Sequence, residues 1–410
     1  MSRKSVNRRR VGPIITGVLI LTVAGCGGNA SDSRADGPIR VGSSLPLTGT
    51  LSQPGKAAKE GYEVWQKMVN DAGGLLGRKV ELVIKDDASN QNTIVSDYNA
   101  LISKDKVDLL IGSYSSLLNL PASAVAERNK KLFVEPAGGS PEMFNRGFEY
   151  LFFTQQATAD KSGLTLAKWM AALPEAERPK TAAYPTVDDP FAAPAVKTMK
   201  EVLEKAGVKT VYETSYPADT KNFDTIIARV KAAKPEVVIN GSGFEDGVGI
   251  VRSLLKADFT PGWLYQIVAP SLGEQYAQAV GAENTEGVMF SISHAPQAKT
   301  PGNAEFVAAY RSMFGGLPPE DAADAFASGQ VLQAAVEGVG GVDDQEALAD
   351  WLRSNSVQTV LGDLSWNKDG SPRGEYLIGQ WQNGKIEYIL PNEIATSGHI
   401  VKGWKPGSKG

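Results

Sequence analysis

Cysteine and histidine are almost absent from this chain of 410 residues, which has one cysteine, Cys26, and two histidines, His294 and His399. A lone cysteine cannot form an intramolecular disulfide, so the fold must be stabilised by burial of apolar side chains. Two histidines exclude the usual zinc patterns and leave little for a His-based triad. A Gly-x-Ser-x-Gly sequence is also absent. We therefore expect no metal, no cofactor and no enzymatic activity.

Acidic residues are absent from the N-terminal segment, which carries five basic residues between Arg3 and Arg10. An apolar stretch follows from Val11 to Ala24, and it is too short to span a bilayer as a stable helix. This pattern predicts a signal peptide over residues 1–25. Its removal changes the formal net charge from −4 to −9. An acidic mature chain argues against nucleic acid as a partner, because phosphate binding needs clustered basic residues.

The small residues directly before Cys26 resemble a bacterial lipobox. The resemblance implies cleavage before Cys26, a lipid on its sulfur and an extracytoplasmic protein anchored to the membrane. The alternative is an ordinary signal peptide with an incidental cysteine. Residues 26–37 are mostly small and polar, so we expect a flexible tether. The pair Arg8-Arg9 leaves open whether export follows the general or the twin-arginine route.

Strand and helix patterns alternate along the rest of the chain. A strand opens at Ile39, and apolar residues at helical spacing follow from Ala58 to Ala72. The same alternation restarts at Thr181, and Gln382-Asn383-Gly384 predicts a late hairpin. Strands that alternate with helices of this length indicate parallel sheets covered on both faces. The fold class is therefore α/β, with two doubly wound parallel-sheet lobes.

Loops after the predicted strands are rich in hydroxyls, glycine and small residues at 43–49, 112–116 and 136–140. In open parallel sheets ligands bind beyond the carboxyl ends of the strands. Hydroxyls and unpaired N–H groups at helix starts suit a carboxylate, although ordinary helix capping explains any single serine. The acidic pairs Asp86-Asp87 and Asp188-Asp189 also follow strands, where carboxylates cap the next helix or line the mouth of a cleft.

Taken in order, several short motifs resemble the branched-chain amino acid-type periplasmic binding proteins, which have the type I fold. The resemblance extends from about Ile39 to Gly384. The motifs that carry it are Pro46–Gly49, Asn70–Gly77, Asp86-Asp87, Leu110–Ser116, Pro136–Gly138, Asn355–Gly362 and Leu364–Trp366.

The resemblance implies two lobes joined by three crossovers, with the ligand held between them. It places the crossovers near residues 155–159, 287–294 and 362–367. The lobes would then comprise 38–157 with 290–362, and 158–289 with 363–405. It also implies a small-molecule ligand and, as partner, the permease of an ABC importer in the cytoplasmic membrane. We expect a monomer.

The resemblance also suggests site residues. Ser116, with Ala137, Gly138 and Gly139, falls where family members hold the ligand on the first lobe, although a hydroxyl residue is usual at Gly139. Aromatic residues expected on the second lobe match Phe191 and Phe244. The acid that pairs a ligand amine is missing near Ile267, where Gln266 is the nearest polar residue. Other acids that could replace it are Glu135, Asp188, Glu245 and Asp246.

These observations predict a binding protein for a small carboxylate-bearing solute, with amino acids as the family default. The missing acid and the two phenylalanines also favour an aromatic acid or an amide. A binding component of a membrane sensor is the main alternative, and an extracellular hydrolase is a third interpretation. The sequence does not select the ligand.

Overall fold

The computed structural model describes residues 37–392 and 395–407. The predicted signal peptide, the lipidation of Cys26 and the tether before Gly37 lie outside the described residues. Among the described residues, no helix is both long enough and apolar enough to cross a membrane.

The first sheet is parallel throughout, with the strand order β2-β1-β3-β4-β5. Its strands are β1 (Ile39–Leu45), β2 (Val80–Asp86), β3 (Leu109–Ile111), β4 (Phe133–Glu135) and β5 (Leu151–Phe153). The helices between them are α1 (Ser52–Asp71), α2 (Gln91–Ser103), α3 (Ser116–Arg128) and α4 (Pro141–Phe144).

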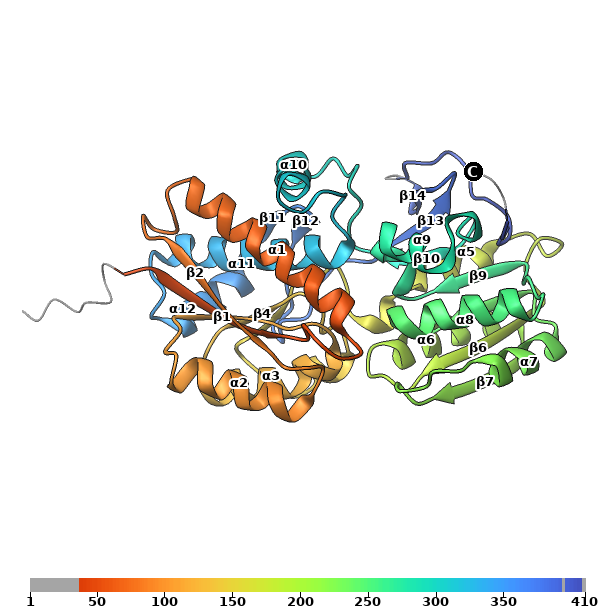
Figure 1. Cartoon of the computed structure of the whole chain (residues 1–410), viewed down its shortest axis with the longest axis horizontal. Helices are drawn as coiled ribbons and strands as arrows, with labels where there is room; N and C mark the ends of the chain where they lie inside the picture. Colours follow the sequence, from red (N-terminus) through yellow and green to blue (C-terminus); the bar gives the residue numbers. More distant parts are fainter. Residues whose placement is uncertain (1–36, 393–394, 408–410) are drawn as a thin grey trace, which may run out of the picture. The chain divides into compact units, whose positions relative to one another are not determined.

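Both faces of this sheet are buried, because successive strand side chains point to opposite sides. On β3, Leu109 and Ile111 pack in one core cluster with α1, whereas Leu110 packs in another with α2 and α3. Figure 1 shows α1 on one side of the sheet and α2 with α3 on the other.

Helices from the C-terminal part complete this first lobe. They are α10 (Asn303–Phe314), α11 (Glu320–Val339) and α12 (Gln345–Ser354). Helix α11 packs along α1, and a β-carbon added at Gly61 would stand 2.0 Å from the carbonyl oxygen of Ala322. The two helix backbones therefore touch, which brings the start of α11 close to the first sheet.

The second sheet has the strand order β14-β13-β10-β9-β8-β6-β7, parallel from β7 to β10 and antiparallel at β13 and β14. Its strands are β6 (Thr181–Val187), β7 (Lys209–Tyr216), β8 (Val237–Asn240), β9 (Trp263–Gln266), β10 (Met289–Ile292), β13 (Leu377–Gln382) and β14 (Lys385–Leu390). Its helices are α5 (Leu164–Ala172), α6 (Ala192–Lys205), α7 (Asp224–Ala233), α8 (Phe244–Lys256) and α9 (Glu274–Val280), with 3-10 turns at Ala159–Lys161, Ala269–Leu272 and Ala282–Asn284. This sheet and these helices form the second lobe.

The chain passes between the two lobes after β5, after β10 and after the hairpin of β11 (Val357–Thr359) and β12 (Gly362–Leu364). The predicted α/β class with two doubly wound lobes is therefore confirmed. The predicted lobe boundary at residue 290 falls inside β10, which belongs to the second sheet, and that at 363 falls inside β12. The other lobe boundaries stay predictions.

Candidate functional site

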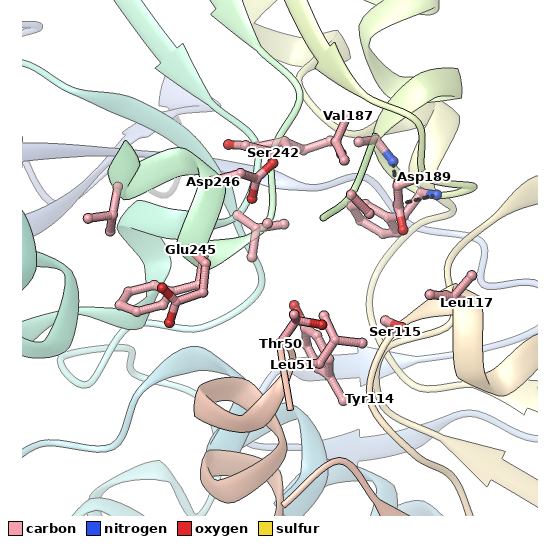
Figure 2. Close-up of a pocket in the computed structure, with 18 of the residues that line it drawn as sticks. Thr50, Leu51, Tyr114, Ser115, Leu117, Val187, Asp189, Ser242, Glu245 and Asp246 are labelled. Atoms are coloured by element: carbon pink, nitrogen blue, oxygen red, sulfur yellow. Dashed lines mark hydrogen bonds between the residues drawn. The ribbon is translucent and has the colours of Figure 1, made fainter. Parts of the chain in front are cut away.

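A cavity of about 320 Å³ lies between the two lobes. Its walls come mainly from loops at the carboxyl ends of the parallel strands, including those after β3, β4, β6 and β8. This is the edge at which open parallel sheets bind ligands. Figure 2 shows Thr50, Leu51 and Tyr114 of the first lobe opposite Ser242 and Asp246 of the second.

Ser115 stands at the start of α3 on the first-lobe wall. Its φ of 70° places it in the left-handed region, and its side chain makes no capping hydrogen bond. The hydroxyl oxygen of Ser115 is buried without a hydrogen-bond partner among the described residues. The start of a helix carries a partial positive charge and N–H groups that its own turns do not satisfy. This corner of the cavity is therefore suited to a negatively charged oxygen.

Ser116, the predicted contact, does not line the cavity. It is fully buried, and its Oγ accepts a hydrogen bond of 3.0 Å from the backbone N–H of Ser140. Ser116 therefore ties the loop after β4 to the start of α3. Ser116 is the first residue of α3, and the residue before it, Ser115, is the one that lines the cavity.

Glu135 fixes the same loop from behind. Its Oε2 accepts hydrogen bonds from the N–H groups of Ala137, at 2.9 Å, and Gly138, and from the side-chain amide of Asn119, at 3.0 Å. Burial raises the pKa of the Glu135 carboxyl to about 8, against the lowering effect of those backbone N–H groups. Ala137 lines the cavity, while Gly138 lies behind it.

Phe191 and Phe244 are half-buried and line the second-lobe wall, as does Asp189. The Oδ1 of Asp189 accepts hydrogen bonds from the N–H groups of Phe191, at 2.8 Å, and Ala192, at 3.0 Å, so this carboxylate holds the start of α6. Gly139 contacts the ring of Phe191 from the first lobe. The two aromatic residues and Ala137 are thus the predicted residues that the structure brings together.

Gln266 is buried in the second lobe and does not line the cavity. Its Nε2 donates to Asn240 Oδ1 and to the carbonyl of Gly247, both at 2.9 Å. Its Oε1 accepts a 2.8 Å hydrogen bond from the hydroxyl of Tyr276. These partners occupy its amide, so Gln266 supports the loops after β8 and β9.

Asp246 lies on the second-lobe wall beside Tyr216. Its Oδ2 accepts a 2.8 Å hydrogen bond from Tyr216, and burial raises the pKa of Asp246 to about 6. Asp246 and the exposed Glu245 are two of the acids that the sequence suggests as partners for a ligand amine. Both line the cavity.

The crossovers supply the floor of the cavity, which includes Gln155, Ser291 and Tyr376. Gln155 links three segments: its Nε2 donates to the carbonyl of Pro136 at 2.9 Å and to Asp324 at 2.6 Å, and its Oε1 accepts from Tyr376 at 2.6 Å. The segments that connect the lobes are therefore joined directly beneath the cavity.

Glu320 and Asp321, at the start of α11, also line the cavity and were not predicted. Acids are common in the first turn of a helix, where they stabilise it, so Pro318-Pro319-Glu320-Asp321 reads as a helix start rather than a site. Only the packing of α11 on α1 reveals that these acids reach the cavity. No group of three or more histidine, cysteine or acidic side chains suited to a metal occurs in the described part of the chain.

The profile of a family described as "Periplasmic binding protein" matches residues 38–385. The "Leu/Ile/Val-binding protein homolog 1" of Brucella melitensis is 30% identical over 92% of this chain and 98% of its own length. The "Amino acid binding protein" of Pseudomonas aeruginosa is 27% identical over 92% of this chain and 98% of its own length.

Solved structures show the same fold. A branched-chain amino acid transporter substrate binding protein, LivJ, from Streptococcus pneumoniae in complex with isoleucine matches 86% of this chain and all of its own, with a TM-score of 0.76 and 19% identity. A solute binding protein of an ABC transporter from R. palustris in complex with benzoate matches 91% of this chain and all of its own, with a TM-score of 0.76 and 20% identity.

Proposed function

Because the chain belongs to the periplasmic binding protein family, in its branched-chain amino acid type, we propose that it captures a small carboxylate-bearing solute outside the cytoplasm and delivers it to an ABC importer. The solute is an amino acid or a related compound, held between the lobes. The protein is a carrier rather than an enzyme in this proposal. Export by the predicted signal peptide and a lipid on Cys26 would hold it at the membrane beside its permease.

The observation that carries this proposal is the cavity itself, which both lobes and the crossovers line. Its volume of about 320 Å³ is at the small end of ligand sites, which suits a metabolite of amino acid size. A ligand that touches both lobes favours the arrangement in which they are close together, so binding and closure are coupled. Closure in turn gives a permease a signal that the carrier is loaded.

The first-lobe wall offers polar contacts to a ligand, and the second-lobe wall offers apolar contacts. The Ser115 hydroxyl and the start of α3 offer hydrogen-bond donors for a carboxylate, which must find partners once water is excluded. Phe191 and Phe244 offer apolar area on the other wall. This combination supports a solute with one carboxylate and an apolar portion.

An aromatic acid is the second candidate. The solved relatives include one in complex with benzoate and one with 3,4-dihydroxybenzoic acid. Phe191 and Phe244 lack the hydroxyl that tyrosine would bring, and their rings suit stacking against an aromatic ligand. A role as the ligand-binding part of a membrane sensor would use the same site and differ only in the partner.

A thermal-shift screen of the mature chain tests the proposal, with amino acids, aromatic acids, amides and sugars as probes. A ligand at a hundredfold excess over its Kd adds about 2.7 kcal/mol to the free energy of unfolding, which gives a clear rise in melting temperature. We expect a rise with at least one carboxylate-bearing probe, and weaker binding of it by the Ser115→Ala variant. A response only to sugars would contradict the carboxylate-binding proposal.

A further inference from the structure

Three acidic residues lie within the first two turns of α11: Glu320, Asp321 and Asp324. Asp321 is 8% exposed and Asp324 is 1% exposed. No ion pair within residues 37–392 and 395–407 involves any of the three. Burial of carboxylates without a counter-charge is costly, so this group needs an explanation.

Two of the three acids have hydrogen-bond donors from the crossovers. Glu320 accepts from the N–H of Ser293 and, at 2.7 Å, from its hydroxyl. Asp324 shares the one Ser293 hydroxyl hydrogen with Glu320 and accepts a further hydrogen bond, at 2.6 Å, from the amide of Gln155. Both carboxyls join the crossovers to α11, and Glu320 also lines the cavity.

Asp321 differs from its neighbours. Its Oδ2 is buried without a hydrogen-bond partner among the described residues, and the residue lines the cavity. Ser242, only 1% exposed on the opposite wall, also has a buried hydroxyl without a partner there. The hydroxyls of Ser115 and Ser162 at the same cavity are likewise buried without a partner among the described residues. Nearly all buried polar atoms in proteins have partners, so these atoms point to a polar ligand.

The other lining residues indicate the sign of the charge that a ligand in this cavity should carry. Five acids line the cavity, and the two bases that do so, Lys221 and Arg252, are exposed. The guanidinium of Arg252 is engaged with the carbonyl of Ala279, at 2.6 and 3.1 Å. The five acids are Asp189, Glu245, Asp246, Glu320 and Asp321.

Acids from both lobes affect the pKa of one residue, Tyr114. Burial raises the pKa of Tyr114 well above its usual value, and the carboxylates of Asp321, Asp189, Glu320 and Asp246 raise it further. Tyr114 lines the cavity, so acids of both lobes lie within electrostatic reach of the same space. Burial also raises the pKa of Asp321 well above its usual value, so a positive group beside it would stabilise its ionised form.

We propose that Asp321, with Glu320 beside it, forms a subsite for a positively charged group, and that the solute is a basic amino acid such as lysine, ornithine or arginine. This inference rests on the proposed function, because it takes the cavity as the solute site. The ligand carboxylate meets Ser115 and the start of α3. One basic group faces Asp246 on the second lobe, and the other faces Asp321 on α11.

Calorimetric titration with L-lysine, L-ornithine and L-arginine tests the inference, with L-norleucine as a probe that matches lysine but lacks its side-chain ammonium. We expect at least one basic amino acid to bind the wild-type protein at least tenfold more tightly than norleucine does. Asp321→Asn should lower that affinity at least tenfold. The exposed acid Asp343 gives a matched control, because Asp343→Asn makes the same change of charge away from the cavity.

Melting curves of the same variants separate a binding role from a structural one. Neutralising a buried carboxyl that has no partner should leave the melting temperature of Asp321→Asn equal to or above that of the wild type. Equal binding by Asp321→Asn and wild type, or no binding of any basic amino acid, would overturn the inference. If leucine, norleucine or benzoate then binds, the proposed solute-binding function still stands; if no carboxylate-bearing probe of the screen binds, both proposals fail.

Discussion

The ring of Phe191, on the second lobe, occupies the space beside Gly139 on the first. A β-carbon added at Gly139 would stand 2.9 Å from Cε2 of Phe191 and 3.0 Å from Cε1 of Phe153. The resemblance led us to expect a hydroxyl residue at position 139. The structure explains the glycine, because the two aromatic rings leave no room for a side chain there.

Gly139→Ser should therefore disturb both the fold and the site. The added atoms must displace Phe191 or the buried Phe153, and overpacking of this kind costs about 1–3 kcal/mol. We expect a lower melting temperature and weaker binding of the solute found in the screen. Gly341→Ser is the control, since nothing lies within 4 Å of a β-carbon there. Wild-type affinity and stability in Gly139→Ser would show that the ring is not held against this loop.

Ser115 and Ser116 should separate affinity from stability. Ser116→Ala removes the acceptor of the buried Ser140 N–H, at a cost of about 1–3 kcal/mol of folding free energy. Ser115→Ala should leave the melting temperature unchanged and weaken a carboxylate ligand about tenfold, which corresponds to about 1.4 kcal/mol. Titration calorimetry and melting curves on both variants check this. The opposite pattern would restore Ser116 as the contact residue.

Phe191→Ala and Phe244→Ala should each weaken solute binding, because each removes apolar area from the cavity wall. Both rings are half-buried, so their loss should destabilise the fold less than Phe153→Ala does. Phe153 is fully buried, and its truncation should cost about 3–5 kcal/mol. A stability loss of that size in the Phe191 or Phe244 variant, with affinity intact, would identify that ring as core.

Glu135 should make stability depend on pH. Its pKa is raised from 4.5 to about 8 in the folded protein, so the folded state holds a proton that the unfolded state releases. This contribution to stability is complete below pH 4.5 and is lost as the pH rises towards 8. Glu135→Gln should therefore melt above the wild type at pH 9 and close to it at pH 4.5. Parallel melting profiles of the two proteins across that range would contradict the assignment.

Cys26→Ala should abolish membrane anchoring. The predicted lipid attaches to the only sulfhydryl in the chain. Fractionation of cells that express each form should find the wild type with the membrane and the variant either released or unprocessed. Wild-type protein in the cytosol with an intact Met1 would disprove the predicted export.

The periodic segments of the sequence predicted the elements well. The strands expected at Ile39 and Thr181 are β1 and β6, the apolar spacing from Ala58 to Ala72 falls on α1 and its C-cap, and the Asn-Gly turn joins β13 to β14 as predicted. Short elements such as β5 and α9 escaped prediction because their apolar runs are too brief to show a period. The resemblance pointed to Ser116, but Ser116 is buried as the first residue of α3, and the residue before it, Ser115, lines the cavity.

The acids of the site were harder to predict. Asp246 comes shortly after β8, and the sequence already suggests it as one of the acids that could pair a ligand amine. Asp321 follows two prolines at the start of a helix and reaches the cavity only through the contact of α11 with α1, which is distant in the chain. Local patterns do not encode such a contact. The structure therefore identifies the acid that the sequence could not.

The long-range packing of α11 also determines when the first lobe can be completed during synthesis. Its five strands are all made by residue 153, yet the core cluster on one face of that sheet extends from Ile39 to Trp366. The second core likewise joins Leu166 to Trp404. In a growing chain α1 can cover only part of the apolar face of this sheet, and the rest stays exposed until α11 has been made. The core of the first lobe is therefore complete only after segments as distant along the chain as Trp366 have been made.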